Sequence, residues 1–132
     1  MKTNLDQFYK TDQNMEKDGI WFSFTDDIAF KMKRFGGFNA TSVKAAMAKY
    51  YKPYARQIKN GMLPPEKEKE VMVKTFVESS ITDWRGIEID GEAVDFSVAK
   101  CIELLLNLPD LADTLVEYAT SFEHFKEELG NS

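Results

Sequence analysis

The chain has 132 residues and a formal net charge of −5, with 43% hydrophobic and 30% charged residues. This length suits one domain, and the composition argues against wholesale disorder. No apolar run approaches the roughly 18 residues that a membrane helix needs, and we expect no secretory signal. The sequence predicts a single globular domain over residues 19–130 after a flexible N-terminal arm over residues 1–18.

The charges are sorted along the chain. Residues 28–65 contain eight basic and no acidic residues, whereas residues 78–132 contain thirteen acidic and three basic ones. The two halves either neutralise each other within one fold or guide the choice of a partner. The same sorting also favours head-to-tail self-association, because a basic half and an acidic half complement each other.

The first part of the chain predicts a β-hairpin and a bent helix. Residues 21–24 and 30–35 are aromatic-rich and partly alternating, which is typical of paired strands. The apolar residues that follow have helical spacing, so we predict a basic helix over residues 43–60. Pro53 interrupts it, because proline lacks the backbone donor that the preceding turn requires.

A second helix is predicted to begin at Pro64 and Pro65, since proline is tolerated in a first helical turn. Its apolar stripe continues through Ile81 and ends near Trp84. Residues 19–82 are therefore expected to form the hairpin and two helices.

The second half, residues 83–130, predicts a short hairpin and two further helices. Gly91 follows an aspartate in a tight-turn dipeptide between two short alternating segments. Ser97 suits the cap of one helix, and Pro109 suits the first position of a last helix that extends to Leu129. The expected fold class is mainly α, or α+β, with about four helices and one or two short β-hairpins.

The chain offers few groups for catalysis. His124 is the single histidine and Cys101 the single cysteine, and neither has a neighbour in sequence that would activate it. The sequence has no metal-ligand spacing and no phosphate-binding glycine motif. We therefore expect no enzymatic activity, no catalytic residue, no metal site and no cofactor.

The basic helix supports a second hypothesis, a small nucleic-acid-binding or regulatory module. Basic residues alternate with tyrosines between residues 43 and 60, a mixture that can bind phosphates and stack bases. Tyrosines at helical spacing more often line the boundary of a core, however, and the acidic second half would repel a polyanion. We expect nucleic acid not to be the partner.

Four turn residues of the second half form the most distinctive pattern in the chain. Trp84 and Gly86 make a turn after a helix, Gly91 lies in the short hairpin, and Pro109 marks a corner between two closing helices. This order resembles the tail assembly chaperones of long-tailed, siphovirus-like bacteriophages. The resemblance extends over roughly residues 18–128.

The resemblance implies a small, mostly helical, non-enzymatic protein of the host bacterial cytoplasm. Members of that family bind the tape-measure protein, keep it soluble and help to recruit tail-tube subunits around it. They are generally absent from the mature virion. The tape-measure protein and the tail-tube protein are therefore the expected partners.

An apolar series on the last helix is the predicted surface for such a client. Its C-terminal part carries Tyr118, Phe122, Phe125 and Leu129, more apolar side chains than one neighbouring helix covers. We expect these residues to stay partly exposed or to be covered by a second copy. Trp84, by contrast, is predicted to be buried where the two halves meet.

Overall fold

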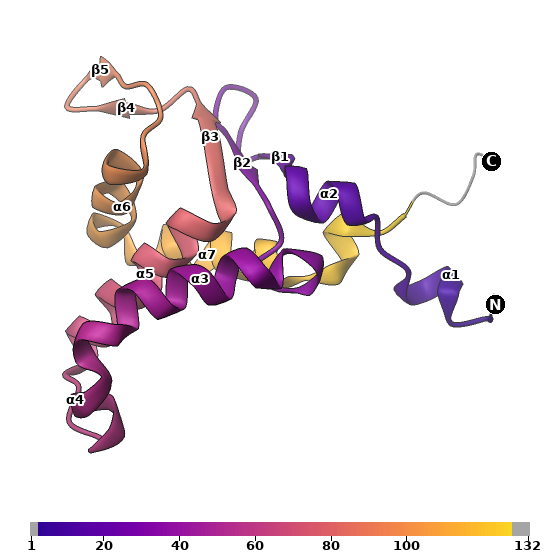
Figure 1. The fold of residues 1–132 in the computed structure, drawn as a ribbon. Coiled ribbons are helices and arrows are strands. Elements are labelled where there is room, and N and C mark those ends of the chain that lie inside the picture. Colours follow the sequence, from indigo (N-terminus) through magenta and orange to yellow (C-terminus); the bar gives the residue numbers. More distant parts are fainter. Residues whose placement is uncertain (1–2, 128–132) are drawn as a thin grey trace.

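The structure is a computed structural model that describes residues 3–127, and its centre is a three-stranded antiparallel sheet (Figure 1). The strands of this sheet, in spatial order, are β1 (Ile20–Ser23), β2 (Ala29–Met32) and β3 (Ile81–Arg85). Strands β4 (Glu88–Ile89) and β5 (Glu92–Ala93) form a separate hairpin. Both hairpins lie where the sequence predicts them.

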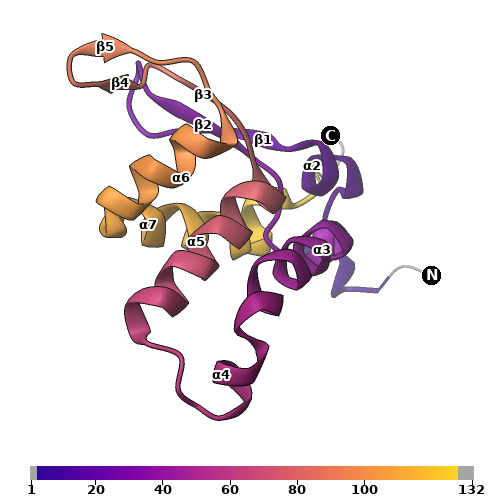
Figure 2. The same ribbon diagram turned by 60° about the vertical axis from the view of Figure 1, so that its left-hand side comes forward.

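Four helices within residues 3–127 have ten residues or more, and one of them contacts each of the other three. They are α3 (Ala40–Tyr51), α5 (Pro65–Ser80), α6 (Val98–Asn107) and α7 (Pro109–Thr120). Helix α5 contacts α3, α6, α7 and strand β3 (Figure 2). The expected fold class, mainly α with about four helices and short hairpins in one domain, is confirmed.

Shorter helices connect and flank these elements. They are α1 (Asp6–Tyr9), α2 (Gln13–Asp18), α4 (Ala55–Lys59) and the 3₁₀ helices η1 (Gly37–Asn39), η2 (Lys52–Tyr54) and η3 (Phe122–Phe125). Pro53 lies in η2 between α3 and α4, so the basic helix is interrupted at the predicted residue.

The hydrophobic core joins the sheet to α5, α6 and α7. Phe22, Phe30 and Trp84 lie opposite one another on β1, β2 and β3, so they share one face of the sheet. The fully buried side chains packed on this face include Met32, Val73, Phe76, Val77, Leu105 and Leu115. The core therefore depends on pairs of elements that are far apart in the sequence.

The stripe of the second predicted helix ends earlier than expected. Helix α5 stops at Ser80, and Ile81 and Trp84 belong to strand β3. Ile81 follows Val77 by four residues, so its spacing also fits a helix. The pairing of Trp84 with Phe30 on β2 decides the conformation in favour of a strand.

Helix α2, within the polar N-terminal segment, packs against the rest of the fold. This finding corrects the expectation of a flexible arm over residues 1–18. Glu16 of α2 is fully buried. Its Oε1 accepts hydrogen bonds from Arg34 Nη1 at 2.8 Å and from the backbone nitrogen of Phe38 at 3.1 Å. A carboxylate is stable inside a protein only with such partners, so this ion pair fixes α2 against η1.

Candidate functional site

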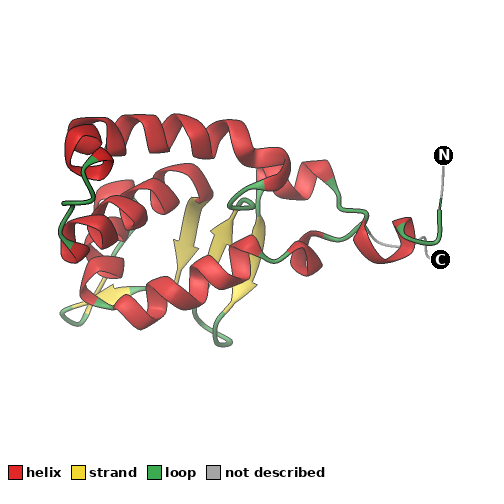
Figure 3. Cartoon of the chain, turned by 90° about the horizontal axis from the view of Figure 1, so that it is seen from below, coloured by secondary structure: helices red, strands yellow, loops and turns green. Residues whose placement is uncertain are grey.

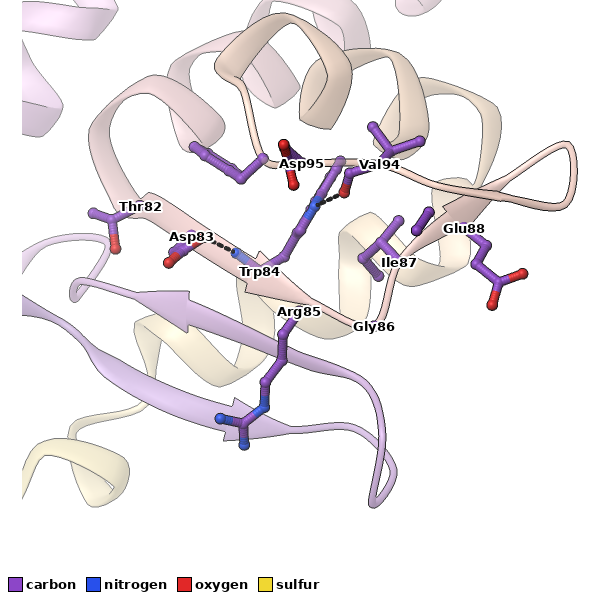
Figure 4. A pocket seen from close by; sticks show the side chains of 11 residues that line it. Thr82, Asp83, Trp84, Arg85, Gly86, Ile87, Glu88, Val94 and Asp95 are labelled. Carbon is purple, nitrogen blue, oxygen red and sulfur yellow. Dashed lines mark hydrogen bonds between the residues drawn. The ribbon is translucent and has the colours of Figure 1, made fainter.

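Trp84 joins the central sheet to the second hairpin. The residue is 5% exposed, and its ring lies edge-on to Phe30 and Phe96, with ring centroids 6.3 and 5.4 Å away. Its indole Nε1 donates a 2.8 Å hydrogen bond to the carbonyl oxygen of Val94 (Figure 4). The position of Trp84 agrees with its predicted burial at the junction of the two halves.

Glycine is required at the turn that follows Trp84. Gly86 has a φ of +76°, and a Cβ atom there would collide with the carbonyl oxygen of Asp27. In the next turn, Asp90 and Gly91 both have positive φ angles, of 54° and 82°, as the tight turn of a hairpin requires. Pro109 occupies the first position of α7, as predicted.

A cleft of about 670 Å³ opens beside Trp84. It is lined by residues 82–88 and 93–96 (Figure 4). Within residues 3–127, no group of three or more His, Cys, Asp or Glu side chains is placed to hold a metal ion. The cleft therefore contains no assembled metal-binding set, and the bond from Trp84 to Val94 links β3 to the segment that follows β5.

Two of the predicted client-binding residues are partly exposed. The ring of Tyr118 is stacked between Phe22 and His124, at centroid distances of 4.0 and 3.7 Å. Burial raises the pKa of the Tyr118 hydroxyl above its ordinary value. Phe122 is half-buried, and its ring packs against Tyr9 at 5.3 Å.

Phe125 is a core residue, which corrects the expectation that it stays partly exposed. Helix α7 ends earlier than predicted, and the chain turns through η3, where Phe125 is 0% exposed. Thr11 forms a β-bridge with Lys126, and the backbone nitrogen of Asp12 donates a 2.8 Å hydrogen bond to the carbonyl oxygen of Phe125. Leu129 lies outside the described residues.

A mostly apolar, exposed hollow lies elsewhere, on the basic helical segment. We refer to it as the α3–α4 groove; it has a volume of about 450 Å³ and is lined by Met47, Ala48, Tyr51, Lys52, Ala55, Ile58 and Lys59. Met47 and Ile58 are 45% and 42% exposed. Helix α4 has no buried residue and extends away from the sheet, so no described element covers this surface (Figures 1 and 2).

The basic residues around the α3–α4 groove differ in their partners. Lys49 Nζ lies 2.7 Å from Glu78 Oε1, which also accepts a 3.0 Å hydrogen bond from the Tyr50 hydroxyl. The hydrogen bond between Lys49 and Glu78 raises the pKa of Lys49 and lowers that of Glu78. Four other bases make no ion pair with a described carboxylate: Lys44, Lys52, Arg56 and Lys59.

Sequence reasoning assigned the tyrosines of this helix to a core boundary and missed the groove. A helical stripe predicts which residues share a face, and it does not reveal whether another element covers that face. The signal available in the sequence was the combination of a methionine, several basic residues and the interruption at Pro53.

The two reactive side chains occupy unreactive surroundings. Cys101 is 0% exposed, and burial raises the pKa of its thiol to about 12. The reactive form of cysteine is the thiolate, and at neutral pH this thiol stays protonated. Cys101 therefore acts as a small apolar core residue. His124 is exposed on one side and stacks on Tyr118. No helix among the described residues has the length and apolar character to cross a membrane.

Comparison with known protein families shows where the chain comes from. The sequence profile of a family described as YdaY prophage protein matches residues 38–131. The chain belongs to the YdaY prophage protein family. No curated protein and no solved structure matches it significantly.

Membership of the YdaY prophage protein family makes the chain phage-derived, which confirms the phage origin implied by the resemblance. The family description contains no reference to tail assembly, so the finer assignment stays a prediction. The matched residues include the whole α3–α4 groove, Trp84 and α7, whereas α1 precedes them.

Proposed function

We propose that this prophage protein is a tail assembly chaperone. In this proposal it binds the tape-measure protein, keeps it soluble and helps to recruit tail-tube subunits in the cytoplasm of the host bacterium. It uses no cofactor, catalyses no reaction and is absent from the mature virion. The observation that carries the proposal is the exposed, apolar α3–α4 groove.

The lining of the groove suits an amphipathic helix. A long helical client presents apolar side chains at intervals of three and four residues, and such anchors bind in apolar grooves. Met47 is flexible and polarisable, so it can adapt to several client segments in turn. Lys52 and Lys59 at the rim would favour segments that also carry acidic residues.

Co-expression with a tape-measure protein tests the proposal. The wild-type chain should keep a large fraction of the client in the soluble extract, and Ile58→Glu should lose most of that rescue by placing a charge in the groove. Leu106→Glu is the matched control, because Leu106 of α6 is 38% exposed and lies outside the groove. Circular dichroism should be the same for all three proteins.

Two outcomes would contradict the proposal: one concerns the chaperone function and the other the location of the client site. No rescue by the wild-type chain would remove the chaperone function itself. Equal rescue by both variants would remove the groove as the client site and return attention to Phe122, the partly exposed residue of the predicted surface. Phe125→Ala cannot serve for that purpose, because Phe125 is in the core.

The four bases without a described partner, Lys44, Lys52, Arg56 and Lys59, favour nucleic acid as the second candidate. Four neutralised phosphates would give a logarithmic salt dependence with a slope of roughly −3 for single strands. The chaperone proposal predicts no saturable binding to DNA or RNA at physiological salt. A micromolar complex with that slope would favour the second candidate.

A further inference from the structure

The short helix α1 is a second exposed apolar feature, at the start of the described chain. We refer to residues 5–9 as the α1 arm. Its Leu5, Phe8 and Tyr9 are 63%, 56% and 62% exposed, and their spacing of three and four residues places them on one side of the helix. No described element buries them, although Tyr9 packs on Phe122.

The α1 arm is held in place at its base. The Thr11–Lys126 bridge and the bond from Asp12 to Phe125 fix the chain that follows the arm. The α1 arm and the α3–α4 groove lie at opposite ends of the molecule (Figures 1 and 3). The arm of one copy therefore cannot occupy the groove of the same copy without release of these contacts.

We propose that the α1 arm of one copy docks into the α3–α4 groove of the next copy, so that the protein associates head to tail. The arm supplies exposed apolar side chains at helical spacing, and the groove supplies an exposed apolar hollow of about 450 Å³. Because the two surfaces differ, an open assembly keeps one free arm and one free groove. It therefore either continues to grow as an open chain or closes into a ring in which every arm and groove is used.

The charges of the two ends agree with this arrangement. Described residues 3–12 and 121–127 at the arm end carry four acidic and two basic residues, whereas residues 40–59 carry five basic and no acidic ones. Opposite charge favours contact between an arm and a groove. Two grooves would repel each other, so the charges disfavour a symmetric groove-to-groove dimer.

The inference concerns the free protein and does not depend on the proposed client. It commits to a second copy as the occupant because one chain carries both the exposed arm and the exposed groove, with complementary charge. A client that binds the same groove would compete with the arm.

A mixing experiment with two variants tests the inference. Leu5→Ser with Phe8→Ser removes the arm contacts, and Ile58→Glu blocks the groove; the changed side chains are exposed, so both variants should fold. In light scattering coupled to size exclusion, the wild type should show masses that rise with concentration, and each variant alone should be a monomer. An equal mixture should form a species of twice the monomer mass and nothing larger, because one intact arm meets one intact groove.

Each alternative result overturns the inference. A wild type that stays monomeric at its highest attainable concentration excludes self-association. A groove variant that assembles as the wild type does shows that the arm docks elsewhere, and a mixture that stays monomeric shows that arm and groove do not pair. Phe24→Ser, at a 48% exposed residue of the β1–β2 turn, is the matched control and should assemble like the wild type.

Discussion

Two helix pairs in this protein are each joined at a proline, but one pair packs into the core and the other leads away from it. Helices α6 and α7 meet at Pro109, and α3 and α4 meet at Pro53. After Pro109 the chain returns to the core, where α6 and α7 bury Cys101, Leu105 and Leu115. After Pro53 the chain leaves the core, and α4 buries no residue (Figure 2).

The comparison shows that an apolar helical stripe becomes core or contact surface according to where the next element goes. In α6–α7, apolar side chains contribute to the stability of the fold. In α3–α4, Met47 and Ile58 stay exposed among basic residues and are available to a partner. Substitutions in the first region should therefore lower stability, and substitutions in the second should lower binding while stability is preserved.

The largest expected effect is at Trp84, which links the sheet to the elements that lead into α6. Trp84→Ala should lower the free energy of unfolding by about 3–5 kcal/mol, because it removes a large buried aromatic side chain and leaves a cavity. Chemical denaturation measures this loss. A change below about 1 kcal/mol would contradict the central place of Trp84 in the core.

The next largest effect is expected at Glu16 of α2, which packs against η1 and lies outside the α6–α7 pair. Glu16→Gln should cost about 3 kcal/mol, because the buried end of Arg34 loses its counter-charge. Thermal or urea unfolding checks the value. If Glu16→Gln is neutral, then α2 is dispensable, and the first description of residues 1–18 as a loose arm would be the better one.

A smaller effect is expected at Ser97, which stabilises α6 as its N-terminal cap and not through packing in the core. Ser97 Oγ accepts a 3.1 Å hydrogen bond from the backbone nitrogen of Lys100 and so caps α6. Ser97→Ala should lower the free energy of unfolding by about 1 kcal/mol. Ser97→Asp is the matched control, because aspartate also caps a helix and should keep most of the stability; equal losses in both variants would argue against the cap.

The smallest effect on stability is expected in the α3–α4 groove. Ile58→Ser should change the free energy of unfolding by no more than about 0.5 kcal/mol, since the side chain is 42% exposed. The same variant should weaken both client rescue and self-association. A loss of stability above about 2 kcal/mol would show that Ile58 belongs to the core and would end the contrast between the two regions.

Local signals were sufficient for much of the fold. Ser97 and Pro109 mark the helix starts correctly, and the Asp90–Gly91 dipeptide marks the hairpin turn. These residues act through hydrogen bonds or backbone angles within a few positions of themselves, so the sequence reveals them directly.

Long-range contacts account for the errors. Ile81 has helical spacing, and only its place beside β2 makes it a strand residue. Glu16 looks like a surface charge until Arg34 lies beside it, and Phe125 is buried by the turn after α7. For the candidate site, the sequence indicated that the basic helix was unusual. It did not indicate that the groove on this helix is uncovered, since that depends on the path of α4.

Hydrogen exchange of this protein in the presence of a tape-measure protein tests the central claim most directly. The Leu5→Ser, Phe8→Ser variant should be used, so that no second copy occupies the groove. Backbone amides in residues 47–59 should exchange more slowly when the client is bound, while those of α6 and α7 should be unchanged. Protection confined to residues 111–125, or no protection at all despite a soluble complex, would contradict the claim that the α3–α4 groove binds the client.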